Sequence, residues 1–185
     1  MEYLETFSKN GKKTGKVEKR SIIHQRGFWH RVVHIWIYNN KGEILIQKRS
    51  LKKDVFPCKW DISAAGHIDV GESPIEAAIR ETAEELGIIL KERDLNYIGK
   101  LNISFLDNKN NVKDNEITYI FSHLTKLEIY NFKIDTSEIS EIKYIKIGKL
   151  IEQLQDSKGA MYNFVPFSRE YIEFLTDYFT KRHPA

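Results

Sequence analysis

Clusters of β-branched and aromatic residues predict several strands in the first third of the chain. Residues 31–38 have this composition and predict a strand. The segment 39–42, Asn-Asn-Lys-Gly, is typical of a turn, and residues 43–49 predict the strand that returns from it. A third strand is expected within 60–68. The first part of the chain therefore supplies the beginning of a sheet.

The remainder of the chain predicts further strands and two terminal helices. The expected elements are strands at 97–105, 117–124 and 141–147 and helices at 149–155 and 168–182. In the last helix, hydrophobic residues recur at helical spacing, which is typical of core packing rather than of a cofactor site. These residues are Tyr171, Ile172, Phe174, Leu175, Tyr178 and Phe179.

The order of the elements predicts an α+β fold with a mixed sheet packed between helices. The length, 185 residues, suits a single domain over 1–185 that buries one good core. Residues 1–25 are expected to form an N-terminal extension built on a hairpin over 1–20. The turn of that hairpin is expected at Asn10-Gly11.

One further helix is strongly specified between residues 73 and 87. Ser73 and Glu76 form a capping box, Pro74 suits the first helical position, and Gly87 suits the left-handed C-terminal position. Its expected buried stripe comprises Ile75, Ala78, Ile79, Ala83 and Leu86. The three acidic residues Glu81, Glu84 and Glu85 are then expected on one exposed side of successive turns.

Three adjacent carboxylates repel one another, and a hard divalent cation removes that repulsion. Mg²⁺ prefers oxygen ligands of this kind and keeps several waters. The preceding loop, Gly66 to Glu72, returns another carboxylate toward the helix, and Arg80 can lock Glu72 or Glu81 through a bidentate pair. An ordinary solvated acidic helix face is the alternative. The loop and Arg80 favour a metal site over it.

Composition indicates the cellular location and the partners of the protein more than the reaction that it catalyses. The single cysteine, Cys58, excludes an internal disulfide and fits a reducing cytosol. Apolar runs stay below the roughly 18 residues that span a bilayer, and the N-terminus turns charged at once. A net charge of +3 is too balanced to indicate a nucleic-acid polymer as partner. We therefore expect a cytoplasmic protein that has no membrane partner.

The segment from Gly66 to Ile88 resembles the Nudix box, G-x5-E-x7-R-E-U-x-E-E-x-G-U, in every fixed position. Only Thr82 departs from the pattern, where a bulky aliphatic residue is usual. The matching residues are Gly66, Glu72, Arg80, Glu81, Glu84, Glu85, Gly87 and Ile88. The resemblance implies an α/β/α sandwich, and a small organic diphosphate that Mg²⁺ (or Mn²⁺ in its place) and water cleave. A homodimer is also common among such proteins.

The same resemblance implies roles for individual residues of the box. Glu84 and Glu85 bind metal together with the Gly66 carbonyl, and Glu81 is either a ligand or the general base. Arg80 orients a glutamate. The loop is supported by Glu72, and the helix ends at Gly87.

The flanks of the box resemble the Nudix branch that contains type 1 isopentenyl-diphosphate isomerase. The similar segments are His24…His30-Arg31, Gln47–Ser50, Phe56-Pro57, Trp60–His67 and Asp114-Asn115-Glu116. The isomerases hold a metal with three histidines and two acidic residues. The matching positions here are His24, His30, His67, Asp114 and Glu116, although the first two are one residue too close together. Each histidine is otherwise read as structural.

Two departures argue against isomerase activity. The isomerase places a cysteine directly before its Gly-His to move a proton at an allylic carbon, and this chain has Ala65 there. Isomerases have also lost several box glutamates that are present here. Hydrolysis is therefore favoured, with isomerisation of a prenyl diphosphate as the alternative, and the group attached to the diphosphate is not specified.

Other flanking residues have both a functional and a structural interpretation. Arg49 and Lys53 are candidates to hold the diphosphate, or they lie on a solvated hairpin edge. Trp60 is a candidate to contact substrate, although core packing is the stronger interpretation. Glu116 begins a strand after a polar stretch and is a candidate ligand or general base.

Overall fold

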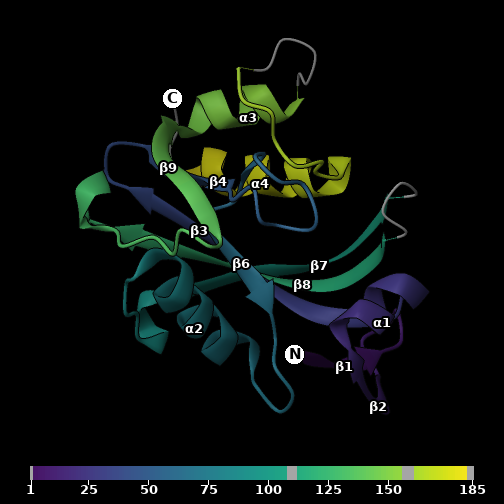
Figure 1. The fold of residues 1–185 in the computed structure, drawn as a ribbon. Helices are drawn as coiled ribbons and strands as arrows, with labels where there is room; N and C mark the ends of the chain where they lie inside the picture. The colour runs from purple at the N-terminus through teal and green to yellow at the C-terminus, as the bar shows by residue number, and fades with distance from the viewer. Residues whose placement is uncertain (1, 108–111, 156–160, 183–185) are drawn as a thin grey trace.

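The protein is described here by a computed structural model that covers residues 2–107, 112–155 and 161–182. A sheet of nine strands runs through these residues, with helices on both faces (Figure 1). The strands are β1 (Tyr3–Phe7), β2 (Lys13–Lys19), β3 (Trp29–Asn39), β4 (Glu43–Arg49), β5 (Trp60–Asp61), β6 (Ala64–His67), β7 (Asn96–Asp107), β8 (Val112–Thr125) and β9 (Ile139–Lys146). The helices are α1 (Arg20–Arg26), α2 (Pro74–Leu86), α3 (Ile147–Gln155) and α4 (Arg169–Arg182), with 3₁₀ turns at Glu92–Asp94 and Ile129–Asn131.

Strand β3 organises the sheet. It pairs in parallel with β8 along its whole length and antiparallel with β6 over residues 32–35. The sheet is therefore mixed, as the order of elements predicted. The β3–β8 register places His30 beside Glu116, and the β3–β6 register places Val32 beside His67. Residues from three distant parts of the sequence thus meet at one end of β3.

The two faces of β3 belong to two hydrophobic cores. Val33, Ile35 and Ile37 are fully buried against the side covered by α2. Trp36 and Tyr38 alternate with them and pack toward α3 and α4 on the opposite face. Figure 1 shows α2 on one side of the sheet and the α3–α4 pair on the other. A strand buried on both faces explains why its sequence is almost continuously hydrophobic.

Helix α2 begins and ends where the sequence predicted, and it buries most of the predicted stripe together with a residue that was expected to be exposed. Both hydrogen bonds of the Ser73–Glu76 capping box are present. Thr82 and Glu85 are buried, at 0% and 5% exposure, whereas Ala83 is partly exposed. The expectation that Glu85 lies on an exposed side was therefore wrong. The Thr82 hydroxyl donates a 2.6 Å hydrogen bond to the Ala78 carbonyl, so this departure from the box pattern is accommodated.

The N-terminal hairpin is present as an antiparallel β1–β2 pair, but its continuation differs from the prediction. Residues 20–26, for which the sequence analysis named no helix, form the short helix α1 after the hairpin. No side-chain cap precedes it, because Lys19 occupies the N-cap position. Gly27 ends the helix with φ of 69°. Among the described residues, no helix is long and apolar enough to cross a bilayer.

Gly87 should be costlier to replace than Gly42. It has φ of 68°, and an added Cβ would lie 2.8 Å from the Lys133 carbonyl oxygen. Gly42 has a similar φ of 67° but open space around it. We expect Gly42→Ala to lower the free energy of unfolding by about 1–2 kcal/mol, the ordinary cost of the left-handed conformation. Gly87→Ala should cost clearly more in urea denaturation, and equal losses would contradict the steric argument.

Candidate functional site

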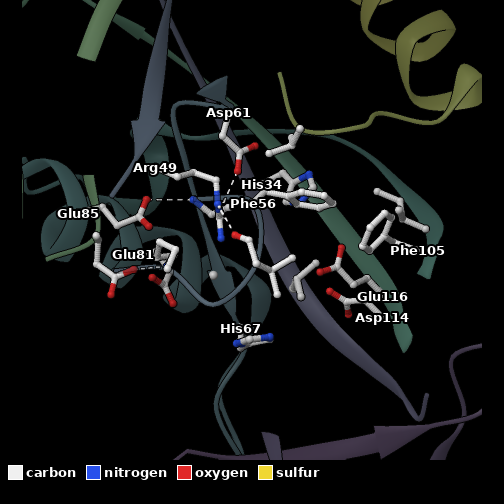
Figure 2. Close-up of a pocket in the computed structure, with 18 of the residues that line it drawn as sticks. His34, Arg49, Phe56, Asp61, His67, Glu81, Glu85, Phe105, Asp114 and Glu116 are labelled. Atoms are coloured by element: carbon white, nitrogen blue, oxygen red, sulfur yellow. Dashed lines mark hydrogen bonds and ion pairs between the residues drawn. The ribbon is translucent and has the colours of Figure 1, made fainter. Parts of the chain in front are cut away.

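A cavity of about 680 Å³ opens between α2 and the strands β3, β6 and β8. Figure 2 shows Glu81 and Glu85 on one side of it and Asp114 and Glu116 on the other, with His67 below. Most of the box and flank residues singled out from the sequence line this one cavity. The cavity is therefore the candidate active site.

The guanidinium of Arg80 holds the acidic side of the cavity together. Its Nε and Nη2 donate to the two carboxylate oxygens of Glu72, at 3.0 and 2.9 Å. Nη2 also donates to the His67 carbonyl at 2.8 Å, and Nη1 donates to Glu81 at 2.7 Å. A weaker bond of 3.2 Å reaches Glu84, which is 60% exposed. Arg80 thus ties the loop after β6 to the acidic face of α2.

Glu81 and Glu85 lie against strand β6. The Ala65 N–H donates to Glu85 at 3.2 Å, and the Gln47 side-chain amide donates to the same oxygen at 3.1 Å. A Cβ on Gly66 would come within 2.0 Å of the Glu81 carboxylate. Glycine at position 66 therefore leaves the space that this carboxylate occupies.

The carboxyl groups of the cavity are buried, and burial disfavours their ionised forms. Burial raises the pKa of Glu85 to about 8, and repulsion from Glu81 adds to the shift. Burial raises the pKa of Glu81 to about 7, although Arg80 opposes it. Burial and the nearby Asp114 carboxylate likewise raise the pKa of Glu116 well above its ordinary range. A divalent cation would favour the ionised forms, so the donor set fits a metal.

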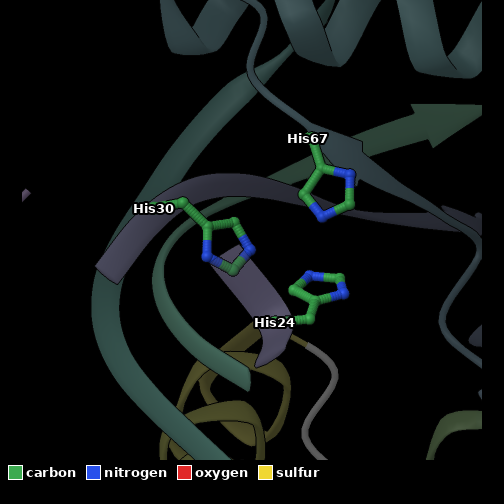
Figure 3. A group of neighbouring side chains, drawn as sticks. All are labelled: His24, His30 and His67. Carbon is green, nitrogen blue, oxygen red and sulfur yellow. The ribbon is translucent and has the colours of Figure 1, made fainter. Parts of the chain in front are cut away.

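Three histidines from separate elements converge at the lower end of the cavity. The rings of His24 (α1), His30 (β3) and His67 (β6) have centroids 5.1 to 5.6 Å apart. Figure 3 shows one nitrogen of each ring pointing into the space between them. One ligand atom from each residue lies within 4.8 Å of the others.

The atoms that face this space lack hydrogen-bond partners. His24 Nε2, His30 Nε2 and Asp114 Oδ1 are all buried without one. His24 Nε2 lies 3.7 Å and His30 Nε2 lies 3.5 Å from Asp114 Oδ1, beyond hydrogen-bond distance. Burial lowers the pKa of His30 to about 3, and the charge of His67 lowers it further, so the ring is neutral. Neutral imidazoles with orphaned nitrogens around a carboxylate fit a metal ion.

The basic residues predicted to hold diphosphate line the cavity but already have acidic partners. Arg49 donates to Asp61 at 2.9 Å and to the Val55 carbonyl at 3.0 Å. Lys53 pairs with Glu138. Both cations lie on the Glu85 side of the cavity wall, close enough to lower the pKa of neighbouring acids.

Not every predicted residue lines the cavity: His30, Glu72, Gly87 and Trp60 do not. Trp60 is 7% exposed and packs in the second core against Tyr162, so it does not line the cavity. Besides the histidines His24, His34 and His67, the aromatic side chains that line it are Phe56, Phe105, Phe167 and Tyr171. His34, on β3, is hydrogen-bonded to the buried Tyr171 hydroxyl at 2.9 Å.

Sequence reasoning did not single out several residues that line the cavity. Asp61, Arg20, Glu2 and Tyr171 belong to this group. Tyr171 was recognised only as part of a helical stripe. Glu2 and Arg20 come from the N-terminal segment, whose helix carried no clear capping signal. Only the tertiary arrangement brings these side chains to the site.

Comparison with known proteins agrees with this geometry. Residues 28–166 match the family model of the NUDIX domain, so the chain belongs to the Nudix family. It is 34% identical to Nudix hydrolase 3 of Arabidopsis thaliana over 78% of this chain, but spans only 19% of that protein. It is also 34% identical to an uncharacterized Nudix hydrolase of Clostridium acetobutylicum, over 84% of this chain and 75% of that one.

The isomerase-like flanks are confirmed as a real likeness. The chain is 29% identical to the isopentenyl-diphosphate Δ-isomerase of Streptomyces coelicolor, over 86% of this chain and 79% of that one. Among solved structures, DR0079 from Deinococcus radiodurans superposes with a TM-score of 0.67 and 20% identity. That superposition covers 95% of this chain and 98% of the other and confirms the Nudix fold.

The raised pKa of Glu85 predicts how the stability of the metal-free protein depends on pH. The folded state keeps a proton on Glu85 up to about pH 8, whereas the unfolded state releases it near 4.5. This stabilisation is complete below pH 4.5 and is lost as pH rises through 8. Between pH 6 and 8 we expect wild type to lose up to about 1.4 kcal/mol per pH unit relative to Glu85→Gln.

Urea unfolding at several pH values measures this difference. The lowered pKa of His30 has the opposite sign, because its stabilisation is lost as pH falls below 6.5. It is common to both proteins and cancels in the comparison. Mg²⁺ should flatten the wild-type curve, because it binds the ionised glutamates. Parallel metal-free curves for the two proteins would contradict the shift.

Proposed function

We propose that the protein is a Mg²⁺-dependent pyrophosphohydrolase that cleaves a small organic diphosphate with water. One observation carries the proposal: Glu81 and Glu85, buried beside Gly66, are held in place by Arg80, Gln47 and the Ala65 N–H. A buried carboxylate pair of this kind is unfavourable without a cation. Mn²⁺ is expected to substitute, because it takes the same oxygen ligands.

The ligands that we propose for this metal come from both sides of the cavity. Glu81, Glu84, Glu85 and the Gly66 carbonyl supply the α2 side, and Glu116 supplies the β8 side. When bound, Mg²⁺ neutralises the diphosphate charge and lowers the pKa of water. Arg80 keeps the glutamates in place, while Glu72 keeps Arg80 in place through its bidentate pair.

The proton of the attacking water passes to Glu81 or Glu116. Burial raises the pKa of Glu81 to about 7 and raises the pKa of Glu116 well above its ordinary range, so each can hold a proton. The water oxygen bonds to one phosphorus, the bond from that phosphorus to the bridging oxygen breaks, and the other phosphate leaves with the bridging oxygen. Arg49 and Lys53 exchange Asp61 and Glu138 for phosphate oxygens of the substrate.

The organic group of the substrate would lie against the apolar wall of the cavity. Phe56, Phe105 and Phe167 line this wall, and the first two rings have centroids 4.6 Å apart. Such a wall supports a substrate group with an apolar face, such as a base or a hydrocarbon chain. A cytosolic location agrees with the exposed thiol of Cys58, which would be exposed to oxidation elsewhere.

The three histidines support a second metal site in the same cavity. Imidazole nitrogens favour zinc, iron or a similar transition metal over Mg²⁺. His24, His30 and His67 would bind it together with Asp114, whose Oδ1 lacks a partner. Glu116 stands beside His30 and Asp114 and links the two sites. This arrangement also favours the alternative function, isomerisation of a prenyl diphosphate.

The residue before Gly66 argues against that alternative. Ala65 lines the cavity and offers no group that moves a proton at carbon. The chain's single cysteine, Cys58, is exposed and is not among the residues that line the cavity.

Glu85→Gln should abolish hydrolysis while preserving the fold. We expect phosphate release from a panel of organic diphosphates with Mg²⁺ to fall about hundredfold or more, because a metal ligand is lost. Glu152→Gln on α3, an exposed residue that pairs with Lys149, is the matched control and should keep wild-type activity. Full activity of the Glu85→Gln protein would refute the proposal.

Isopentenyl diphosphate distinguishes the two functions. Because Ala65 supplies no thiol, we expect no dimethylallyl diphosphate when wild type is incubated with isopentenyl diphosphate and Mg²⁺ or Zn²⁺. Product analysis by mass spectrometry after chromatographic separation of the isomers gives the result. Conversion that disappears in Glu116→Gln would establish the isomerase instead.

A further inference from the structure

Glu2 approaches the histidine cluster from a part of the chain that precedes the matched Nudix domain. It lies directly before β1, and its Oε1 is 2.7 Å from His67 Nδ1. Its other oxygen, Oε2, is 3.5 Å from Arg20 Nε at the start of α1. The hairpin β1–β2 and the single β1–β3 pair at Phe7 and Trp29 hold this segment against the sheet. Glu2 is therefore held beside the cavity by the fold.

The contact with Glu2 determines which nitrogen of His67 carries its proton. An ionised carboxylate only accepts hydrogen bonds, so His67 Nδ1 must be the donor. In the neutral ring, Nε2 is then left with a free lone pair. Figure 3 shows a nitrogen of His67 pointing between His24 and His30. Because Nδ1 faces Glu2, the nitrogen that faces the cluster is Nε2.

His30 is oriented in the same way by a different acceptor. Its Nδ1 lies 3.2 Å from the Phe28 carbonyl, which can only accept a hydrogen bond. Its Nε2 is buried without a partner and faces Asp114. Two of the three rings therefore have an outer acceptor at Nδ1 and a free Nε2 toward the same space. An acceptor behind each ring is the usual arrangement around metal-binding histidines.

We propose that Glu2 is a positioning residue for the histidine metal site, which fixes the tautomer and orientation of His67 so that Nε2 faces the metal. This inference rests on the second metal site of the proposed function. It is independent of the glutamate site on α2. A carboxylate behind the ring also makes the imidazole a stronger ligand than a carbonyl would.

The tautomer of His67 is the direct test in the metal-free, full-length protein. Long-range ¹H–¹⁵N spectra identify which ring nitrogen is protonated. In wild type we expect Nδ1–H at His67, and in Glu2→Ala we expect the Nε2–H form to become populated. In Glu2→Gln, the side-chain carbonyl can still accept the bond, so Nδ1–H should persist. Unchanged His67 spectra in Glu2→Ala would overturn the proposal.

Zinc affinity provides the second measurement. Calorimetric titration with Zn²⁺ alone should show a site that His30→Ala removes. Loss of an outer partner typically weakens metal binding about 10- to 100-fold, and we expect this loss in Glu2→Ala with a smaller one in Glu2→Gln. Wild-type zinc affinity in Glu2→Ala, or no site that depends on His30, would overturn the inference.

A matched control separates positioning from a general effect on the N-terminal segment. Glu5 lies in β1 and pairs with Lys13 and Arg31 rather than with a histidine. Glu5→Gln should leave both the His67 tautomer and zinc affinity at wild-type values. If it weakens zinc binding as much as Glu2→Ala does, packing of the hairpin explains the effect and the proposal fails. Phosphate release by the Glu85→Gln protein tests the hydrolase separately.

Discussion

The hydrogen bonds of Arg80 are the interaction on which the site depends. A single planar guanidinium bonds both oxygens of Glu72, the His67 carbonyl and Glu81. The loop after β6 and the helix α2 therefore keep a fixed relation to each other. Lysine would not replace this geometry, because its ammonium cannot make a planar bidentate pair. The arginine also compensates part of the charge that Glu81 and Glu84 bring together.

Burial and charge are balanced differently at the two ends of the cavity. On the α2 side, burial raises the pKa values of Glu81 and Glu85. A bound cation would therefore make these acids ionise more readily. On the histidine side, burial lowers the pKa of His30 and keeps its nitrogen free. The same desolvation thus prepares oxygen ligands at one end and nitrogen ligands at the other. Glu116, on β8, lies beside His30 and Asp114.

Local signals explain how much of the site could be predicted from the sequence. The capping residues Ser73 and Gly87 act within one helix, so the sequence predicts where that helix begins and ends. The spacing of the box residues likewise predicts a metal site from a single segment. Burial of Glu85 could not be predicted in this way, because it depends on Gln47 and β6 packing over the helix. Helix α1 is short and lacks a side-chain cap, so its sequence was interpreted only as an extension. Strands β1 to β5 and helix α1 separate Glu2 from His67 in the sequence, so their contact leaves no local pattern.

The most direct measurement is a crystal structure of the protein soaked in Mn²⁺, with data collected for anomalous scattering from manganese. A strong anomalous peak beside the Glu81 and Glu85 carboxylates and the Gly66 carbonyl is the predicted result. Occupied density there would show that Arg80 holds these groups ready for a cation. Manganese found only among the histidines, or no peak near α2, would contradict the proposed hydrolase centre.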